Sequence, residues 1–270
     1  MRKTTAPFPS ILCGVEGESA STEAARQAIA LATAGAALHF LAVYTTFRLP
    51  KHSGEELQES LEGIAQLAQD AGVPASIELA RGRHAVDVLL QESEHYDLLV
   101  LGSHNHSRAA GILIGSTASK AAHETQRPLL IAREPPNPGR FPRSVLLASD
   151  GSPGSWPAAR TAASIAIAFN ASLELVHVVD GTHPERSSVL EAQIVEIREV
   201  IDEEPALTEP AGHPTQGIIE AARGRGSSLI VCGRRGLHGI RALGSVSERV
   251  VHQAPCSVLL IPAGNGESDS

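Results

Sequence analysis

The stretch Leu229-Ile230-Val231-Cys232-Gly233 is followed, after a short loop, by Gly244-Ser245. A similar arrangement occurs earlier in the chain, where Leu98-Leu99-Val100-Leu101-Gly102 precedes Gly115-Ser116. An apolar run that ends in glycine is typical of a buried parallel strand, and a serine before a periodic pattern is typical of a helix start. Both stretches therefore predict a strand, a loop and a helix, in that order.

The rest of the chain repeats around these two stretches. A shift of 134 residues places Leu12 on Leu146 and Ala24-Ala25-Arg26 on Ala158-Ala159-Arg160. One repeat of this length indicates a duplicated domain. Between the copies, residues 134–142 contain four prolines, which favour an extended linker. We expect a first domain at residues 1–135, a linker at 136–142, a second domain at 143–264 and a flexible tail at 265–270.

Within each half, short apolar runs alternate with segments whose apolar residues recur every three or four positions. We expect strands at residues 11–15, 38–44, 75–80, 98–101, 129–132, 145–148, 173–179, 206–209, 229–232 and 258–261. We expect helices at residues 20–34, 54–71, 84–93 and 116–124, with equivalents in the second half. This alternation predicts an α/β fold: two tandem doubly wound domains, each with a mainly parallel five-stranded sheet covered on both faces.

The composition narrows the range of partners. The formal net charge is −8 and aromatic residues make up only 3%, so we expect neither nucleic acid nor a membrane surface as a partner. Cys13, Cys232 and Cys256 have no metal-ligand spacing and are expected to be buried free thiols. No stretch fits a signal peptide or a transmembrane helix, which predicts a cytoplasmic protein. No metal site is expected, because His104 and His106 lack further ligands at a suitable spacing.

Two loops in each half are candidates for ligand binding, because open parallel sheets bind ligands beyond the carboxyl ends of their strands. The turn after the first strand carries an acidic residue, Glu16 in one half and Asp150 in the other. The loop after the fourth strand begins and ends with glycine, which lets backbone N–H groups approach a ligand closely. It leads into a helix N-terminus, which favours anions. This combination suits a phosphate chain. Arg234, Arg235 and Arg241, or Arg108 in the first half, are expected to supply charge to it, and surface charge is the alternative for Arg234 and Arg235.

At these residues the sequence resembles the universal stress protein family. Members of that family end the first strand in a Val-Asp-Gly-Ser-like turn, and those that bind ATP carry Gly-x2-Gly-x9-Gly-Ser/Thr after the fourth strand. The resemblance covers residues 9–133 and 143–262 and implies a tandem two-domain member with adenine nucleotide alpha hydrolase-like domains. It further implies that ATP or AMP binds, with or without Mg²⁺. The adenine would lie near Val43 and Val178, and the phosphates on the glycine loops.

The resemblance implies one set of binding residues in each half. They are Glu16, Val43, Gly102, Asn105, Gly115, Ser116 and Thr117, and then Ser149, Asp150, Val178, Cys232, Gly233, Gly236, Gly244, Ser245 and Val246.

Each half departs from the ATP-binding pattern. The first has Asn105 in place of the second glycine and Glu16 in place of aspartate. The second keeps Asp150 and the glycines, but its loop is two residues shorter. Two residues span at most about 7 Å, comparable to the length of a diphosphate. The sequence therefore leaves open which half binds, and whether the ligand is ATP, AMP, cyclic AMP or none.

The sequence argues against a dedicated enzyme. It contains neither a Gly-x4-Gly-Lys-Ser/Thr loop nor a Gly-x-Ser-x-Gly elbow, and neither glycine loop contains a lysine. We expect a non-enzymatic stress-response or signalling module that binds adenine nucleotide, with at most slow, incidental ATP hydrolysis. The alternative is a nucleotide-free scaffold with a degenerate pocket. A PP-loop-type enzyme is a weaker option, because neither first turn has a Ser-Gly-Gly-x-Asp-Ser-like pattern.

The resemblance also implies how the domains associate. They would form a pseudo-dimer within one chain, with residues 129–132 paired with residues 258–261. Whether two chains associate further is left open.

Overall fold

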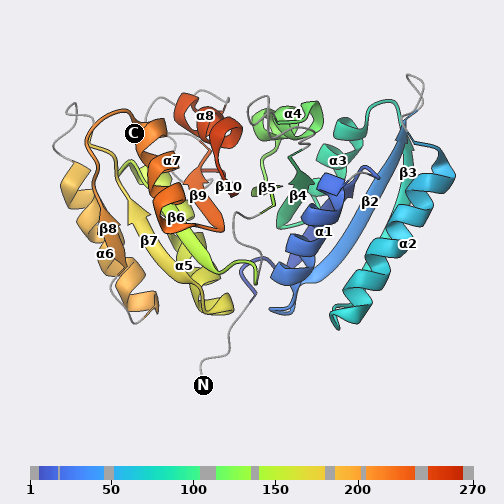
Figure 1. Cartoon of the computed structure of the whole chain (residues 1–270), viewed down its shortest axis with the longest axis horizontal. Coiled ribbons are helices and arrows are strands. Elements are labelled where there is room, and N and C mark those ends of the chain that lie inside the picture. Colours follow the sequence, from blue (N-terminus) through green and yellow to red (C-terminus); the bar gives the residue numbers. More distant parts are fainter. Residues whose placement is uncertain are drawn as a thin grey trace. The chain divides into compact units, whose positions relative to one another are not determined.

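The computed structural model describes residues 6–17, 19–45, 52–103, 114–134, 140–179, 186–201, 205–234 and 243–263. Residues 8–134 belong to one compact unit, here called the N-terminal unit, and the described residues from 140 onward belong to the other, the C-terminal unit. Strands and helices alternate along the chain in both (Figure 1). The domain bounds, the linker at 136–142, the tail at 265–270 and the pairing of the two units stay predictions.

The N-terminal unit contains β1 (Ser10–Val15), α1 (Ser19–Ala32), β2 (Ala37–Thr45), α2 (Gly54–Asp70), β3 (Ala75–Gly82), α3 (Ala85–Ser93), β4 (Leu98–Gly102), α4 (Ser116–Glu124) and β5 (Leu129–Ala132). Its strands lie in the order β3-β2-β1-β4-β5 and pair in parallel. Helix α1 contacts α2, and α3 contacts α4. The winding direction reverses between β1 and β4, which is where a doubly wound sheet opens a crevice.

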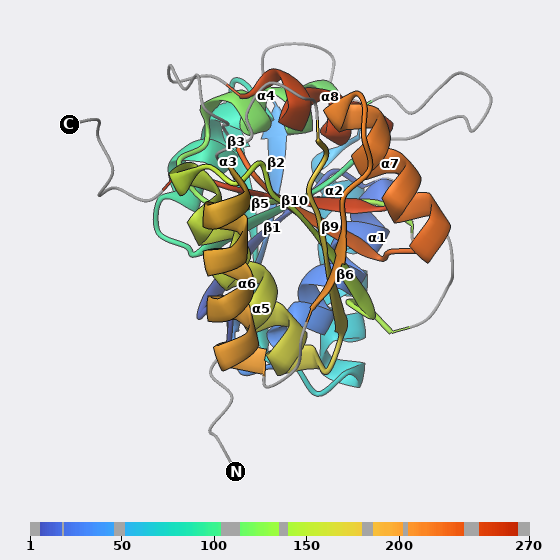
Figure 2. The ribbon, with the colours of Figure 1, turned by 90° about the vertical axis from the view of Figure 1, so that its left-hand side faces the viewer.

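The C-terminal unit repeats this plan with β6 (Ser144–Ala148), α5 (Trp156–Phe169), β7 (Ser172–Val176), α6 (Arg186–Ile201), β8 (Ala206–Thr208), α7 (Pro214–Arg225), β9 (Leu229–Gly233), α8 (Ser245–Gln253) and β10 (Ser257–Ile261). The strand order is β8-β7-β6-β9-β10, again parallel. Figure 2 shows α5 and α6 on one side of β6 and β9, and α7 on the other. The predicted fold, two doubly wound α/β domains, is confirmed.

The cores lie around the central strands, and the edge strands differ from them. Every residue of β5 and of β10 is buried, and full burial of one leucine or isoleucine stabilises a fold by roughly 1.5–3 kcal/mol. In contrast, exposed and half-exposed residues alternate along β3, and β8 is largely exposed. Coverage on both faces was predicted for all strands. It is wrong for β3, which pairs with β2, and for β8, which pairs with β7, because exposed residues along both strands show that they are not covered on both faces.

Local hydrogen bonds fix where several helices begin and end. At the start of α2, Ser53 Oγ accepts the N–H of Glu56 (3.1 Å), and the Glu56 carboxylate accepts the N–H of Ser53 (2.7 Å), forming a capping box. Helix α5 ends at Phe169 and is capped by Asn170, whose φ of 47° is left-handed. Arg140 donates to the carbonyl oxygen of Asn170 (2.8 Å), so the end of this helix is also satisfied by a side chain.

One strand is shorter than predicted. A strand was expected at residues 173–179, but β7 ends at Val176. The pairing continues irregularly, because the N–H of His177 bonds to Thr208 (3.0 Å) and the N–H of Val179 bonds to Pro210 (2.9 Å). Proline has no N–H to donate, so Pro210 cannot extend a regular ladder from β8.

Candidate functional site

Two loops meet at the same edge of each sheet. Strand β1 pairs with β4 in the N-terminal unit, and β6 pairs with β9 in the C-terminal unit. Glu16 and Ser103 follow the first pair of strands, and Asp150 and Arg234 follow the second pair at equivalent positions. The acidic turn and the glycine loop of each unit therefore begin on neighbouring strands.

In the N-terminal unit a serine side chain of α1 holds the acidic turn. The N–H of Glu16 donates to Ser21 Oγ on α1 (2.8 Å). Gly17 has a φ of 74°, a left-handed conformation that favours glycine. A Cβ atom at Gly17 would lie 3.4 Å from the ring of His52, so this histidine borders the turn. Sequence reasoning did not single out His52.

The glycine loops are closed at their ends by matching hydrogen bonds. Ser103 donates its N–H to the last residue of β5 (3.0 Å) and accepts the N–H of Gly115 (3.2 Å). Arg234 donates its N–H to the last residue of β10 (2.7 Å) and accepts the N–H of Gly244 (2.9 Å). In both loops, therefore, the closing glycine is hydrogen-bonded to the first residue after the strand.

The helices that follow these loops begin where the sequence predicts. Gly115 caps α4 with a φ of −64°, and Gly244 caps α8 with a φ of −67°. Glycine has no side chain, so neither cap residue satisfies the N–H groups of the first helical turn. Ser116 and Ser245, the first helical residues, are exposed. These amides and the positive end of the helix dipole can receive an anion.

The remaining predicted residues of the glycine loops are placed as follows. Thr117 and Val246 are half-buried in the first turns of α4 and α8, and Gly102 and Gly233 end β4 and β9. Asn105 and Gly236 lie outside the described residues, as do Arg108, Arg235 and Arg241. The side chain of Arg234 is almost fully buried, with 1% exposed, so the alternative that it is a surface residue is wrong.

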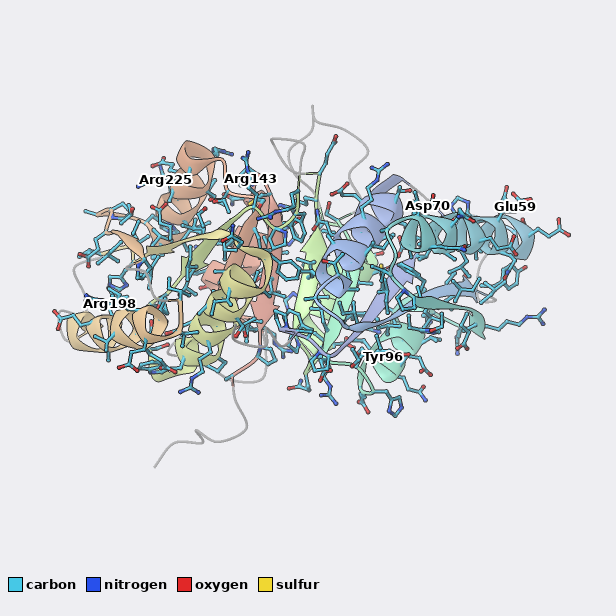
Figure 3. The ribbon with its side chains drawn as sticks, turned by 90° about the horizontal axis from the view of Figure 1, so that it is seen from below. Glu59, Asp70, Tyr96, Arg143, Arg198 and Arg225 are labelled. Carbon is cyan, nitrogen blue, oxygen red and sulfur yellow. The ribbon has the colours of Figure 1, made fainter. Side chains whose placement is uncertain are left out.

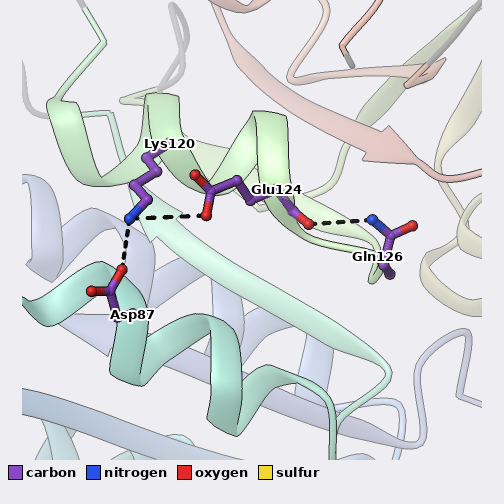
Figure 4. Close-up of polar contacts among 4 residues, drawn as sticks. All are labelled: Asp87, Lys120, Glu124 and Gln126. Atoms are coloured by element: carbon purple, nitrogen blue, oxygen red, sulfur yellow. Dashed lines mark hydrogen bonds and ion pairs between the residues drawn. The ribbon is translucent and has the colours of Figure 1, made fainter. Parts of the chain in front are cut away.

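Helix α4 is fixed to α3 by an ion pair on the surface. Lys120 Nζ lies 2.6 Å from Asp87 Oδ1 and 3.9 Å from Glu124 Oε2 (Figure 4). The hydrogen bond from Lys120 lowers the pKa of the Asp87 carboxyl group. Gln126 donates to the carbonyl oxygen of Glu124 (3.3 Å) just past the end of the helix. The Lys120–Asp87 ion pair therefore links α3 to the helix whose N-terminus borders the glycine loop.

In the C-terminal unit the acidic turn orients its own carboxylate. Asp150 Oδ1 accepts hydrogen bonds from the N–H (3.0 Å) and from Oγ (2.6 Å) of Ser152. Gly151 is left-handed, with a φ of 68°, and donates its N–H to Ser149 Oγ (3.1 Å). Asp150 is half-buried at the edge of the sheet. The turn therefore presents a carboxylate whose orientation is set by local hydrogen bonds.

A buried polar network supports this turn from below. Gln193 of α6 is fully buried; its Oε1 accepts from Ser149 Oγ (2.7 Å), and its Nε2 donates to Ser155 Oγ (2.6 Å). Ser155 Oγ donates to the carbonyl oxygen of Ser152 (2.6 Å). His177 Nδ1 lies 3.0 Å from the carbonyl oxygen of Ser149. A carbonyl can only accept, so this ring nitrogen carries the proton.

The two valines predicted beside an adenine occupy comparable positions. Val43 is buried near the end of β2, and a Cβ at Gly82 would lie 3.5 Å from it. Val178 is half-buried after β7, and a Cβ at Gly217 would lie 2.7 Å from its Cγ2. A glycine from another element therefore packs closely on each valine.

The three cysteines are buried thiols and form no disulfide, as expected. Cys232 directly precedes Gly233, the last residue of β9. Burial raises the pKa of its thiol to about 12. Burial also raises the pKa of Cys13 far above its usual range. Neither thiol is a nucleophile at neutral pH, so Cys232 contributes packing to the site.

Neither a cluster of metal-binding side chains nor a membrane-spanning helix occurs in the described part of the chain. The parts of the chain that the structure describes hold no cluster of three or more histidine, cysteine or acidic side chains suited to a metal ion. Among the described helices, none combines the length and the apolar character that crossing a membrane requires.

The family assignment follows from the comparison of each half with a known family. The model of the universal stress protein family matches residues 7–133 and 142–262. The chain belongs to this family. Two copies of the family domain are therefore arranged in tandem in this universal stress protein.

Individual relatives agree with this assignment. "Universal stress protein in QAH/OAS sulfhydrylase 3'region" of Thermus aquaticus is 37% identical over an alignment of 134 residues that covers 44% of this chain and 98% of that protein. A universal stress protein structure from Archaeoglobus fulgidus covers 95% of this chain and 99% of its own at a TM-score of 0.77, and its 22% identity shows a shared fold. A universal stress protein solved in complex with cAMP is 26% identical and covers 45% of this chain and 98% of its own at a TM-score of 0.39.

Sequence reasoning missed the residues that support the acidic turns. Gln193 and His177 come from a helix and a strand end that are distant in sequence from Ser149, and Ser155 was not assigned a role. One signal was present. Gln193 lies between Leu190 and Ile197 on the buried side of α6, and a glutamine in an apolar stripe needs a buried hydrogen-bond partner.

Proposed function

We propose that this universal stress protein binds an adenine nucleotide, ATP or AMP, as a non-enzymatic stress-response or signalling module. The ligand would lie at the carboxyl edge of a sheet, with its phosphates on the glycine loop and helix start. In the N-terminal unit the contacts would come from Glu16, Val43, Gly102, Asn105, Gly115, Ser116 and Thr117. In the C-terminal unit they would come from Ser149, Asp150, Val178, Cys232, Gly233, Gly236, Gly244, Ser245 and Val246.

One observation carries the proposal: the closing glycine of each loop caps the next helix and bonds back to the residue after the strand. This bond holds an uncapped helix N-terminus beside the end of β4 or β9. The neighbouring strand of each unit is followed by a turn that carries an acidic residue, Glu16 or Asp150. Donors for phosphate at the helix start and an acceptor for a ribose hydroxyl in the turn therefore follow adjacent strands.

The chemistry of the loops favours binding over catalysis. Neither loop, at residues 102–116 or 233–245, contains a lysine that could stabilise a departing phosphate. Backbone amides hold phosphate equally well before and after a reaction, and such uniform binding does not accelerate the chemical step. Bound nucleotide would instead tie the loops together and change the stability of the unit.

A nucleotide-free scaffold is the second candidate. It is favoured by the departures of both loops from the ATP-binding pattern: Asn105 replaces a glycine in the first, and the second is two residues shorter.

Thermal unfolding with Mg-ATP, AMP and cyclic AMP separates the two candidates. At a hundred times the dissociation constant, a ligand adds about 2.7 kcal/mol and should raise the midpoint by roughly 5–10 °C. Gly115→Arg and Gly244→Arg, made singly, should each remove the response of one unit. Gly63→Arg on α2 and Gly224→Arg on α7 are matched controls, because a Cβ at either glycine meets open space. No shift with any nucleotide at millimolar concentration would support the scaffold.

A further inference from the structure

The C-terminal unit contains a buried glutamine whose hydrogen bonds all end on the acidic turn, here residues 149–155. Gln193 of α6 has no exposed surface. Its amide oxygen accepts from Ser149 Oγ at 2.7 Å, and its amide nitrogen donates to Ser155 Oγ at 2.6 Å. A primary amide has one acceptor and one donor side, and here each is matched to a hydroxyl group at opposite ends of the same turn.

One set of hydrogen-bond directions satisfies the network. Ser149 Oγ lies 3.1 Å from Ser155 Oγ and 2.7 Å from Gln193 Oε1, and its proton is assigned to the shorter contact. Ser149 gives its proton to Gln193 and so accepts from Gly151 (3.1 Å). Ser155 accepts from Gln193 and so gives its proton to the carbonyl oxygen of Ser152 (2.6 Å). Each hydroxyl has a single proton, and this arrangement uses both without conflict. A satisfied buried network makes one conformation of the turn much more stable than others.

This conformation is the one that orients Asp150. Ser152 donates twice to Asp150 Oδ1, and the carbonyl of Ser152 is held in turn by Ser155. Gln193 therefore acts on the carboxylate through Ser155 and Ser152, and on the preceding backbone through Ser149. It does not itself approach the edge of the sheet, because its side chain is completely enclosed.

We propose that Gln193 is a positioning residue of the C-terminal nucleotide site, which sets the geometry of Asp150 through Ser149 and Ser155. This inference rests on the proposed function. The inference adds to the proposed function that the nucleotide affinity of one unit depends on a helix residue that does not touch the ligand. Preorganisation of this kind strengthens binding because the turn need not be ordered when the ligand arrives.

Gln193→Met tests the role, because methionine keeps the length of the side chain and removes both hydrogen-bonding groups. The matched control is Gln27→Met. Gln27 is a second buried glutamine, 1% exposed on α1 of the N-terminal unit, where it donates to Glu23 (2.8 Å) and to the carbonyl oxygen of Arg133 (2.7 Å). Ser155→Ala removes the other end of the network and serves if Gln193→Met folds poorly.

The first measurement needs no nucleotide. Amide hydrogen exchange of Gly151 and Ser152 should accelerate about tenfold in Gln193→Met and in Ser155→Ala, as expected when a supporting hydrogen bond is lost. The same amides should exchange normally in Gln27→Met. Unchanged exchange in Gln193→Met would overturn the inference whether or not the protein binds nucleotide.

The second measurement is calorimetric titration of Mg-ATP and of AMP into proteins that also carry Gly115→Arg, so that only the C-terminal unit can respond. Gln193→Met should raise the dissociation constant about tenfold, the equivalent of one hydrogen bond, whereas Gln27→Met should not. An unchanged or a lower dissociation constant in Gln193→Met would overturn the inference. If Gly115→Arg alone abolishes all binding, the proposed function fails for the C-terminal unit, and the role of Gln193 in affinity fails with it. Accelerated exchange in Gln193→Met would then show that the network supports the turn and that the missing ligand site is the cause of the failure.

Discussion

The N–H of Gly244 lies 2.9 Å from the carbonyl oxygen of Arg234 and closes the loop after β9. The same bond joins Gly115 to Ser103 in the N-terminal unit, at 3.2 Å. It holds the first turn of the following helix beside the strand end. The φ of Gly244 is −67°, close to the angle that a proline ring imposes. The donor can therefore be removed while the backbone angle is kept.

Gly244→Pro should weaken nucleotide binding by the C-terminal unit about tenfold, because the loop loses the hydrogen bond that closes it. Helix content should not change, since proline is tolerated where a helix starts. Calorimetric titration in a Gly115→Arg background and circular dichroism provide the two readouts. Gly244→Ala is the control, because alanine keeps the N–H. Equal affinities of the proline and alanine variants would show that the closing bond is irrelevant to binding.

Two glycines on α7 should respond in opposite directions to alanine. A Cβ at Gly217 would lie 2.7 Å from Val178 Cγ2 and 3.3 Å from Pro210, so Gly217→Ala should destabilise the protein by about 1–2 kcal/mol through overpacking. At Gly224 a Cβ meets nothing within 4 Å, and Gly224→Ala should stabilise by about 0.5–1 kcal/mol through helix propensity. Urea unfolding measures both. A stabilised Gly217→Ala protein would mean that Val178 moves aside freely.

His39 should make stability fall in mild acid. Burial lowers the pKa of this histidine, against the opposing effects of Glu78 and Glu92, and its ring stacks on Tyr96 at 5.9 Å. Tyr96 is labelled in Figure 3. The unfolded chain binds a proton at His39 below about pH 6.5, and the folded chain does so only at lower pH. Stability from this group is thus complete above pH 6.5 and is lost as the pH drops toward the folded pKa.

The test compares wild type with His39→Gln, which retains a polar group opposite Ser76, the partner of His39 Nδ1 at 2.7 Å. The free energy of unfolding is measured in urea from pH 5 to pH 8. The difference between the two proteins should shift against wild type as the pH falls. A constant difference, or one that shifts in favour of wild type, would contradict the direction of this pKa.

Removal of the capping box of α2 should have a moderate cost. Ser53→Ala loses the acceptor of the Glu56 N–H and should destabilise the N-terminal unit by about 1 kcal/mol. Ser53→Asp, which restores an acceptor at the cap, should recover most of this loss. Chemical denaturation of the three proteins provides the comparison. If aspartate fails to rescue, the serine contributes through packing and not through capping.

Much of the fold could be predicted because local patterns and tertiary structure agree. The helix predicted at residues 116–124 has those bounds in the structure, since Gly115 in front of Ser116 and Thr125 after Glu124 mark both ends. Strand β5 likewise has its predicted bounds at 129–132. Strand β7 was predicted three residues too long, because its end depends on Pro210 of a different segment.

The support of the site could not be predicted in the same way. Glu16, Asp150 and the glycines stand out because turn chemistry is local in sequence. Gln193 bonds to Ser149 across 44 positions of the chain, and Arg225, labelled in Figure 3, pairs with Glu174 (3.1 Å) across a similar span. Such contacts depend on the way two elements pack, and hydrophobic periodicity gives the face of a helix without naming its partner.

The enclosed glutamine of α6 has a consequence for the later history of a duplicated gene. In the N-terminal unit, α2 is the helix that corresponds to α6. The buried residue in the middle of α2 is Leu61, which has no polar group. Under the proposed function, substitutions in α6 would change the nucleotide affinity of one copy while the other copy keeps its own. Two copies that began alike would then bind the same nucleotide at different concentrations, without a change in any residue that contacts it.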